Sequence, residues 1–146
     1  MDSKNNKSSF QFSNPILVKS LFISNNFDND SDGYEMTVHF ETEVDYISNN
    51  IAEVTLRVFN IDISNVNNYL EKNVPYILDI VMSAQFKWSS SIADPSEFLR
   101  QNAPSLIFSY MRPYISTITG MSKFSKTDIP FVDFTNNKLI NEKEDD

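Results

Sequence analysis

Residues 102–120 read NAPSLIFSYMRPYISTITG and carry one charge, Arg112, in a chain of 146 residues whose formal net charge is −8. The apolar side chains of this segment fall on two neighbouring stripes of a helix, because they recur at spacings of three and four residues. The first stripe is Ile107, Met111, Tyr114 and Ile118, and the second is Phe108 and Ile115. A helix that is apolar on two sides needs two packing partners. We expect the domain's own sheet to cover one side, and another segment or another subunit to cover the other.

The same helix contains Pro113, which lacks the N–H that would bond to the Ser109 carbonyl. A proline in a helix interior costs about 3 kcal/mol, whereas burying one large apolar side chain contributes about 1.5–3 kcal/mol. Packing can therefore hold this helix together, with a kink at the proline. Upstream, Asp94 followed by Pro95 is typical of a helix start, and Asn102 is expected to cap the segment that follows.

Four upstream segments are predicted to be strands: residues 15–24, 34–46, 51–63 and 74–88. In the last three, apolar and polar side chains alternate, which is the pattern of antiparallel strands with one solvated face. The apolar phase of the third shifts near Val58, which indicates a bulge or a change in what covers the strand. The fourth alternates without a break over its whole length.

Length and composition predict one domain. We expect a polar, mobile arm over residues 1–13, a folded domain over residues 14–137 and an acidic tail over residues 138–146. No apolar run approaches the roughly 18 residues of a membrane span, and the polar N-terminus lacks the apolar centre of a secretory signal, so a cytoplasmic protein is expected. The negative charge argues against nucleic acid and anionic membranes as partners, because both require a basic surface.

The residues that usually carry catalysis are scarce. The chain has one histidine, His39, no cysteine and two glycines, so it contains no GxSxG elbow, cysteine nucleophile or glycine-rich phosphate loop. One histidine without cysteines is also a poor metal site. Glu41 and Glu43 share a strand face and could act as an acid–base pair, or they could form a solvated face that keeps the sheet from pairing with a neighbour. We expect a protein that is not an enzyme and uses no cofactor or metal.

Four segments match, in order, the elements of one protein family. AEVTLRVFNI (residues 52–61) is similar to that family's third strand, and YILDIVMSAQF (residues 76–86) to its fourth. NAPSLIFSYMRPYI (residues 102–115) is similar to its proline-anchored long helix, and residues 124–134, which end in FVDF, resemble its helix-connecting loop. The family is SecB, the bacterial protein-export chaperone. The resemblance covers about residues 15–137 and depends on the ordered set rather than on one motif.

The resemblance implies an α+β fold, a four-stranded antiparallel sheet with a long helix from the C-terminal half packed on one face. It also implies a homotetramer, built as a dimer of dimers with the long helices between the sheets; a dimer is the alternative. The first helical stripe would then form the oligomer interface: Ile107, Met111, Tyr114 and Ile118.

The SecB family binds unfolded client proteins without ATP, in grooves between the sheet and the helix-connecting loop. The resemblance therefore predicts an ATP-independent holdase that serves protein export or other clients. By position, the loop contributes Phe124, Ile129, Phe131, Val132 and Phe134 to such a groove. By their chemistry, Tyr76 and Trp88 would contribute from the strand side.

One family feature differs in this chain. In SecB, acidic residues of the first strand help to dock the motor protein SecA, but the corresponding positions here are Ser20 and Ser24. Asp79 retains the acidic character of that surface and is the candidate docking residue, with SecA as a candidate partner. The alternative function is a binding or scaffold protein of the same fold with one dedicated partner, for example an antitoxin.

Overall fold

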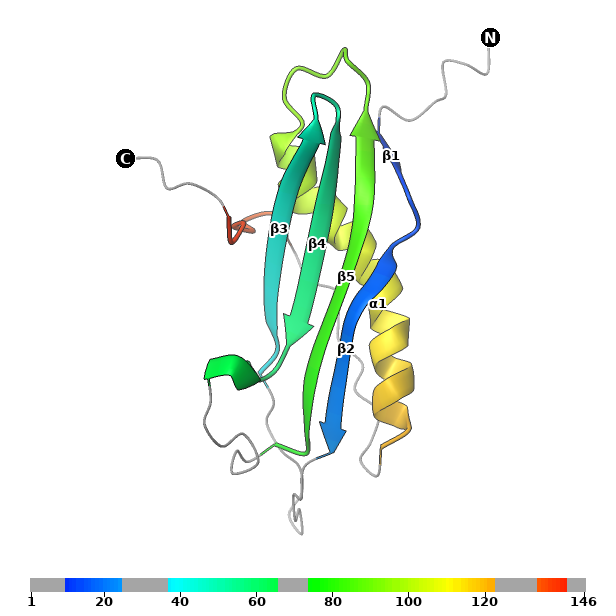
Figure 1. The fold of residues 1–146 in the computed structure, drawn as a ribbon, viewed down its shortest axis with the longest axis vertical. Helices are drawn as coiled ribbons and strands as arrows, with labels where there is room; N and C mark the ends of the chain where they lie inside the picture. The colour runs from blue at the N-terminus through cyan, green and yellow to red at the C-terminus, as the bar shows by residue number, and fades with distance from the viewer. Residues whose placement is uncertain (1–9, 25–36, 66–73, 123–133, 142–146) are drawn as a thin grey trace.

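An antiparallel sheet and one C-terminal helix make up the computed structural model, which describes residues 10–24, 37–65, 74–122 and 134–141 (Figure 1). The strands are β1 (Phe10–Phe12), β2 (Ile16–Ser24), β3 (His39–Ser48), β4 (Ile51–Phe59) and β5 (Tyr76–Trp88). A 3-10 turn, Ile63–Asn65, follows β4, and a π-helical turn, Phe98–Asn102, leads into α1 (Ala103–Gly120). The predicted α+β fold class is confirmed.

The strand β5 organises the sheet. On one side it pairs with β4, which in turn pairs with β3. On the other side two strands pair with it in succession, β2 against Tyr76 to Ser83 and β1 against Phe86 to Trp88. The sheet therefore has the four predicted strand positions, but the edge position beside β5 is divided into β1 and β2. The break lies near Pro15, which has no N–H to donate to a neighbouring strand. Residues 10–12, assigned by composition to the mobile arm, form β1 of the sheet.

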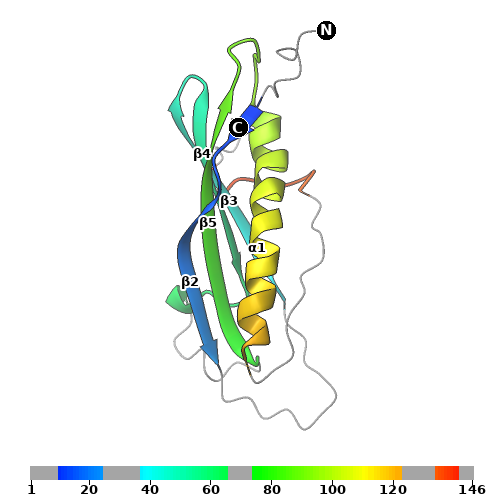
Figure 2. The same ribbon diagram turned by 90° about the vertical axis from the view of Figure 1, so that its right-hand side faces the viewer.

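The helix α1 lies along one face of the sheet (Figure 2). Alternation along β4 and β5 turns every second side chain toward this face, and these side chains form the core with the buried side of α1. The strand contribution includes Ala52, Val54, Leu56, Val58, Leu78, Ile80, Met82 and Phe86, and the helix contributes Ile107, Phe108, Met111 and Ile115. The other face of the sheet, called the open face below, points away from α1.

The helical region begins where Asp94 and Pro95 predict. The Ser96 N–H donates to Asp94 Oδ1 at 3.0 Å, and the Leu99 N–H donates to the Pro95 carbonyl. The prediction that Asn102 caps a second segment is wrong: its backbone is helical and its side chain makes no capping bond, because the π-helical turn continues directly into α1.

Pro113 is accommodated on the exposed side of α1. The Ser109 residue, whose carbonyl would pair with the N–H that proline lacks, is exposed as well, so water can solvate that carbonyl. Buried residues on the opposite side of the helix, such as Met111 and Ile115, provide the packing that offsets the missing bond.

The strand β4 ends at Phe59, four residues before the predicted end. The buried Asn60 stops it by using its side chain as a strand partner: Nδ2 donates to the Tyr76 carbonyl and Oδ1 accepts from the Leu78 N–H, both at 2.8 Å. The register between β4 and β5 has no shift. The change of apolar phase near Val58 therefore marks the end of the strand rather than a bulge.

Candidate functional site

The described aromatic residues that were predicted to line a groove lie in the core of the single chain. Tyr76 is fully buried, and Trp88 and Phe134 are each 5 % exposed. The Phe134 ring packs edge-on against Phe40 and Phe108, which fixes the start of the C-terminal segment beneath the sheet edge. The other predicted groove residues, Phe124, Ile129, Phe131 and Val132, lie outside the described residues.

The helical stripe predicted for the oligomer interface divides into two parts. Ile107 and Met111 are fully buried against the sheet, so the chain covers them without a second copy. Tyr114 and Ile118 are half-buried at the flank of α1. Tyr110, one turn before Tyr114, is exposed. A helical period identifies apolar stripes but does not say which neighbour covers each one, and here the sheet covers the side that was assigned to a subunit.

Large apolar side chains are exposed along the edge of the sheet that β1 and β2 form. This β2-edge surface consists of Phe12, Ile16, Leu17, Val18 and Tyr110. Ile16 is 62 % exposed and Val18 is 57 % exposed, and the pairing register between β2 and β5 shifts between Leu17 and Lys19. Three consecutive apolar residues cannot all face one side of a strand, so this run was a readable signal in the sequence that the groove prediction did not use.

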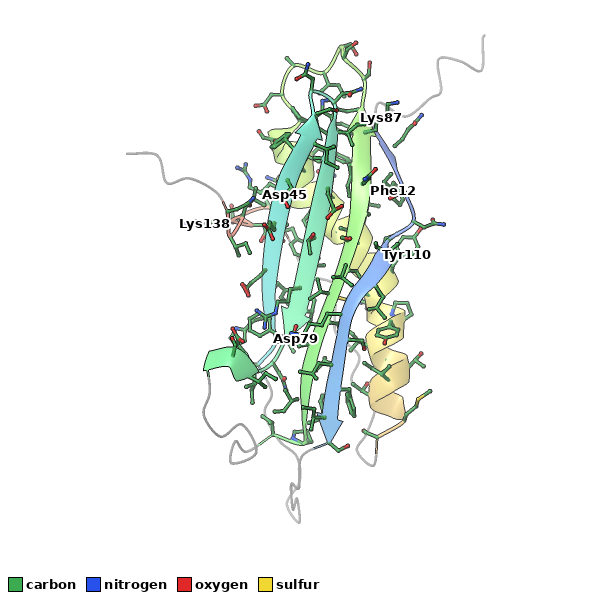
Figure 3. All side chains as sticks on the ribbon, viewed as in Figure 1. Phe12, Asp45, Asp79, Lys87, Tyr110 and Lys138 are labelled. Carbon is green, nitrogen blue, oxygen red and sulfur yellow. The ribbon has the colours of Figure 1, made fainter. Side chains whose placement is uncertain are left out.

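The β2-edge surface is continuous with α1. Phe12 and Tyr110 lie side by side where β1 meets the helix, with ring centroids 6.5 Å apart in an edge-on arrangement (Figure 3). One turn further along α1, the Tyr114 hydroxyl and the Ser20 hydroxyl are 2.7 Å apart. Tyr110 and Tyr114 of the helix therefore contact β1 and β2 at this edge of the sheet. Unpaired strand edges with apolar side chains are templates for pairing with another chain.

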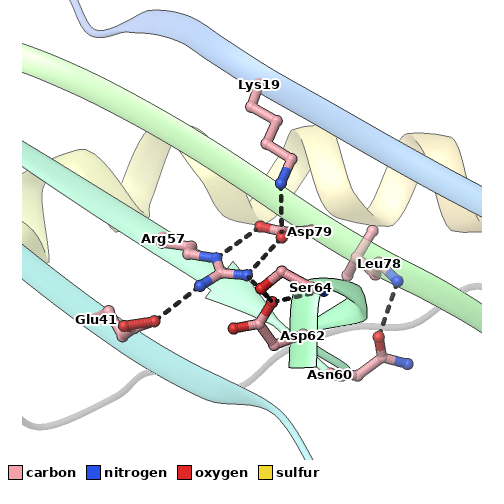
Figure 4. Close-up of polar contacts among 8 residues, drawn as sticks. All are labelled: Lys19, Glu41, Arg57, Asn60, Asp62, Ser64, Leu78 and Asp79. Atoms are coloured by element: carbon pink, nitrogen blue, oxygen red, sulfur yellow. Dashed lines mark hydrogen bonds and ion pairs between the residues drawn. The ribbon is translucent and has the colours of Figure 1, made fainter. Parts of the chain in front are cut away.

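Asp79 lies on the open face within an ionic network (Figure 4). Its side chain is 1 % exposed. Arg57 donates to both carboxylate oxygens, Nε to Oδ1 at 3.0 Å and Nη2 to Oδ2 at 2.7 Å, and Lys19 Nζ donates to Oδ2 at 3.0 Å. The same guanidinium also binds Glu41 at 2.9 Å and lies 3.5 Å from Asp62.

This network ties four strands together, β2, β3, β4 and β5, and withdraws Asp79 from solvent. Burial alone would raise the pKa of Asp79, but the hydrogen bonds and charges of Arg57 and Lys19 outweigh burial and hold that pKa below its usual value. The bidentate bond to Asp79 in turn raises the pKa of Arg57. A covered carboxylate that is already paired with two cations cannot present its charge to a docking partner, so the structure gives Asp79 a role in stability instead.

The opposite edge of the sheet is β3, and the C-terminal segment, residues 134–141, lies along its outer side (Figure 1). The Ile140 N–H donates to the Thr42 carbonyl at 2.9 Å, and Leu139 forms a parallel bridge with Thr42. The Asn141 side chain bonds both backbone groups of Val44: Nδ2 donates to the carbonyl at 2.7 Å, and Oδ1 accepts from the N–H at 3.4 Å.

Beyond Val44 the end of β3 exposes two apolar side chains. Tyr46 is 57 % exposed and Ile47 is 54 % exposed. Tyr46 packs edge-on against Trp88 with ring centroids 6.1 Å apart, so its ring is held in place by the core while one side faces solvent. This β3-edge surface, Tyr46 and Ile47 beside the C-terminal segment, was not predicted from the sequence.

The described residues offer little for catalysis. Glu41, one half of the suggested acid–base pair, is held by Arg57, and His39 packs against the Phe59 ring at 5.4 Å. Within the four described ranges, no three histidine, cysteine or acidic side chains come together to hold a metal ion. No helix in the described part of the chain is long and apolar enough to cross a membrane.

Comparison with known proteins supports the fold at the level of structure. No protein-family model matches the sequence, and no curated protein sequence matches it. Among solved structures, the chain is similar to a SecB-like chaperone of Mycobacterium tuberculosis, solved in complex with a peptide from an antitoxin. The two share 15 % sequence identity with a TM-score of 0.66, over 85 % of this chain and 91 % of the other. The two proteins therefore share a fold despite low identity.

Proposed function

We propose that this chain is a non-catalytic chaperone that binds extended segments of other polypeptides without ATP. The supporting observation is the exposure of large apolar side chains along both edges of a sheet whose fold is shared with a SecB-like chaperone. Strand edges bind extended chains through the main chain, and apolar side chains beside them add affinity with little sequence preference. The formal charge of −8 keeps a loaded complex soluble and favours basic clients.

We further propose that the β2-edge surface joins copies of this chain. The helix stripe predicted for this role is partly buried in the core, whereas Ile16, Leu17 and Val18 remain exposed on the strand whose Ser20 contacts Tyr114. An exposed apolar edge strand is a site at which another chain tends to associate. A homo-oligomer, a tetramer or a dimer, covers this edge and leaves the β3 edge for clients.

The client surface in this proposal is the β3-edge surface, extended by the loop residues Phe124, Ile129, Phe131 and Val132. Tyr46 and Ile47 offer apolar contact at an edge that already accepts main-chain hydrogen bonds. Apolar burial contributes about 25 cal/mol per Å², less the entropy of ordering the client, so many modest contacts are needed. Docking of SecA through Asp79 is not part of the proposal because that carboxylate is buried and paired.

Suppression of aggregation tests the chaperone proposal. Guanidinium-denatured citrate synthase is diluted into buffer with increasing amounts of the chain, and light scattering is followed with and without ATP. We expect scattering to fall as the oligomer reaches stoichiometric amounts, with no effect of ATP. The double variant Tyr46→Ser/Ile47→Ser removes the exposed apolar side chains of the β3-edge surface and should suppress aggregation less than the wild type does. Undiminished aggregation at a tenfold excess, with this and other clients, would refute a holdase.

The second candidate is a binding protein with one dedicated partner. It is favoured by the structural neighbour, which was solved with a peptide from an antitoxin. Capture of bound proteins from a lysate of the source cells, identified by mass spectrometry, separates the candidates. A heterogeneous set of apolar, incompletely folded proteins supports the general chaperone, whereas a single stoichiometric partner supports the dedicated one.

A further inference from the structure

The C-terminal segment imitates a bound strand at the edge of β3. It makes hydrogen bonds to the main chain of β3 at Thr42 and at Val44, which are two residues apart. Backbone groups of an antiparallel strand alternate in direction, so groups two residues apart face the same edge. These contacts are therefore on the outer side of β3, the side that β4 does not use, and the next outward-facing position along the strand is Tyr46.

The hydrogen bonds at this edge are of the kind that an added strand makes. Ile140 donates its N–H to the Thr42 carbonyl as a strand neighbour would. Asn141 then replaces a peptide group with its side-chain amide, because that amide both donates to and accepts from Val44. Asn137 adds a side-chain bond to Thr42 Oγ1 at 3.0 Å and one to the Arg100 carbonyl at 3.0 Å.

The occupation of the edge is partial. The segment forms a single bridge with β3 rather than a ladder. One of the Asn141 bonds is long at 3.4 Å, and Ile140 remains exposed. The segment is anchored at its start by the buried Phe134, so it can leave β3 and still stay attached beside it. A longer bound strand with regular main-chain hydrogen bonds would make more hydrogen bonds to β3 than this segment does, and could therefore displace it.

We propose that the outer edge of β3, from Thr42 to Tyr46, accepts an extended polypeptide as an added strand, and that residues 134–141 act as an internal competitor that this ligand displaces. The proposal builds on the polypeptide-binding function above and specifies its mode and its regulation. The ligand is an extended segment with a free main chain and an apolar side chain for Tyr46 and Ile47. The competitor keeps the edge covered when no ligand is present, which limits edge-to-edge association.

Two opposite perturbations of the full chain test the competitor. Asn137→Ala/Asn141→Ala removes its side-chain bonds, and Asn136→Ala, at an exposed asparagine of the same segment, is the matched control. Thr42→Cys/Leu139→Cys joins the bridge partners by a disulfide, and the same variant in its reduced form is the control. The chain contains no cysteine, so no other disulfide can form within it.

The readouts are the dissociation constant of fluorescein-labelled, reduced and carboxymethylated α-lactalbumin, and the hydrogen exchange of the Val44 amide. We expect the asparagine variant to bind this unfolded probe about tenfold more tightly and to expose the Val44 amide until the probe is added. The oxidised cysteine variant should bind at least tenfold more weakly than its reduced form. The Asn136 control should match the wild type in both readouts.

Three results would count against the inference, and they differ in what they say about the function. Equal binding by the oxidised and reduced cysteine variants, with probe binding retained, overturns strand addition at β3 but leaves the chaperone proposal standing. Equal binding by the asparagine variant and wild type, with Val44 already exposed in the wild type, overturns the competitor. Absence of probe binding in every form overturns both proposals.

Discussion

Replacement of Asp79 by asparagine probes the ionic network that ties β2, β3, β4 and β5 together. The substitution keeps the shape of the side chain but removes the charge that accepts three hydrogen bonds from Arg57 and Lys19. Removing one partner of a buried ion pair costs about 3–5 kcal/mol. The cost here should lie at or below the lower end, about 2–3 kcal/mol, because Arg57 keeps Glu41 and Asp62 and the Lys19 side chain is half-exposed to water.

Urea unfolding followed by tryptophan fluorescence measures this cost, because the only tryptophan, Trp88, is buried at the end of β5. The thermal midpoint of Asp79→Asn should fall by about 4–12 °C, at about 2–4 °C per kcal/mol for a chain of this size. Glu41→Gln is the matched control, since it removes a partly exposed partner of the same guanidinium. The control should cost no more than about 1 kcal/mol.

The dependence of stability on pH provides a second test of the Asp79 network. Because the folded-state pKa of Asp79 is lowered, its contribution is complete above the unfolded pKa of aspartate, about 3.9, and is lost as the pH falls through the folded value. The wild type should therefore lose stability below about pH 4 more steeply than Asp79→Asn does. If Asp79→Asn and Glu41→Gln have equal stabilities at pH 7 and parallel acid profiles, the network does not stabilise the fold as reasoned here.

Three further predictions concern the edges and the helix. Val18→Glu places a charge on the β2-edge surface and should lower the mass of the oligomer in light scattering, whereas Asn49→Glu, in the exposed β3–β4 turn, should not; equal masses would exclude this edge as the contact. Pro113→Ala restores a helix N–H and should raise the free energy of unfolding by about 1–3 kcal/mol in urea titrations. A variant less stable than the wild type would contradict the claim that packing of α1 offsets a hydrogen bond missing at Pro113. Tyr46→Ser/Ile47→Ser should weaken binding of an unfolded probe about tenfold, or about 1.4 kcal/mol, in fluorescence anisotropy without changing the oligomer mass; unchanged binding would place the client elsewhere.

The alternation of apolar and polar residues was the pattern that predicted most of the fold. It identified β3, β4 and β5, and the unbroken run from Val74 to Trp88 correctly indicated a long strand. β1 was missed because it has three residues, and the strand with which it pairs, β5, is more than 70 positions away. Local patterns do not report such a distant pairing, which depends on the register of the whole sheet.

The sites were harder to predict than the fold, and for a physical reason. The helical period placed Ile107 and Met111 on an apolar stripe, but only the packed structure shows that the sheet covers that stripe. Alternation placed Asp79 on the polar face, yet its burial comes from Arg57 and Lys19 on two neighbouring strands. The exposed run Ile16–Val18 was visible in the sequence, because a strand cannot bury three consecutive side chains on one face.

Native mass spectrometry of the purified chain, alone and with an unfolded protein that cannot refold, shows whether this chain is an oligomer that binds unfolded polypeptides. We expect a homo-oligomer in the absence of any ligand and, without ATP, a complex in which this oligomer carries the unfolded chain. A monomer that forms no complex with several such probes, at any ratio tried, would contradict this expectation.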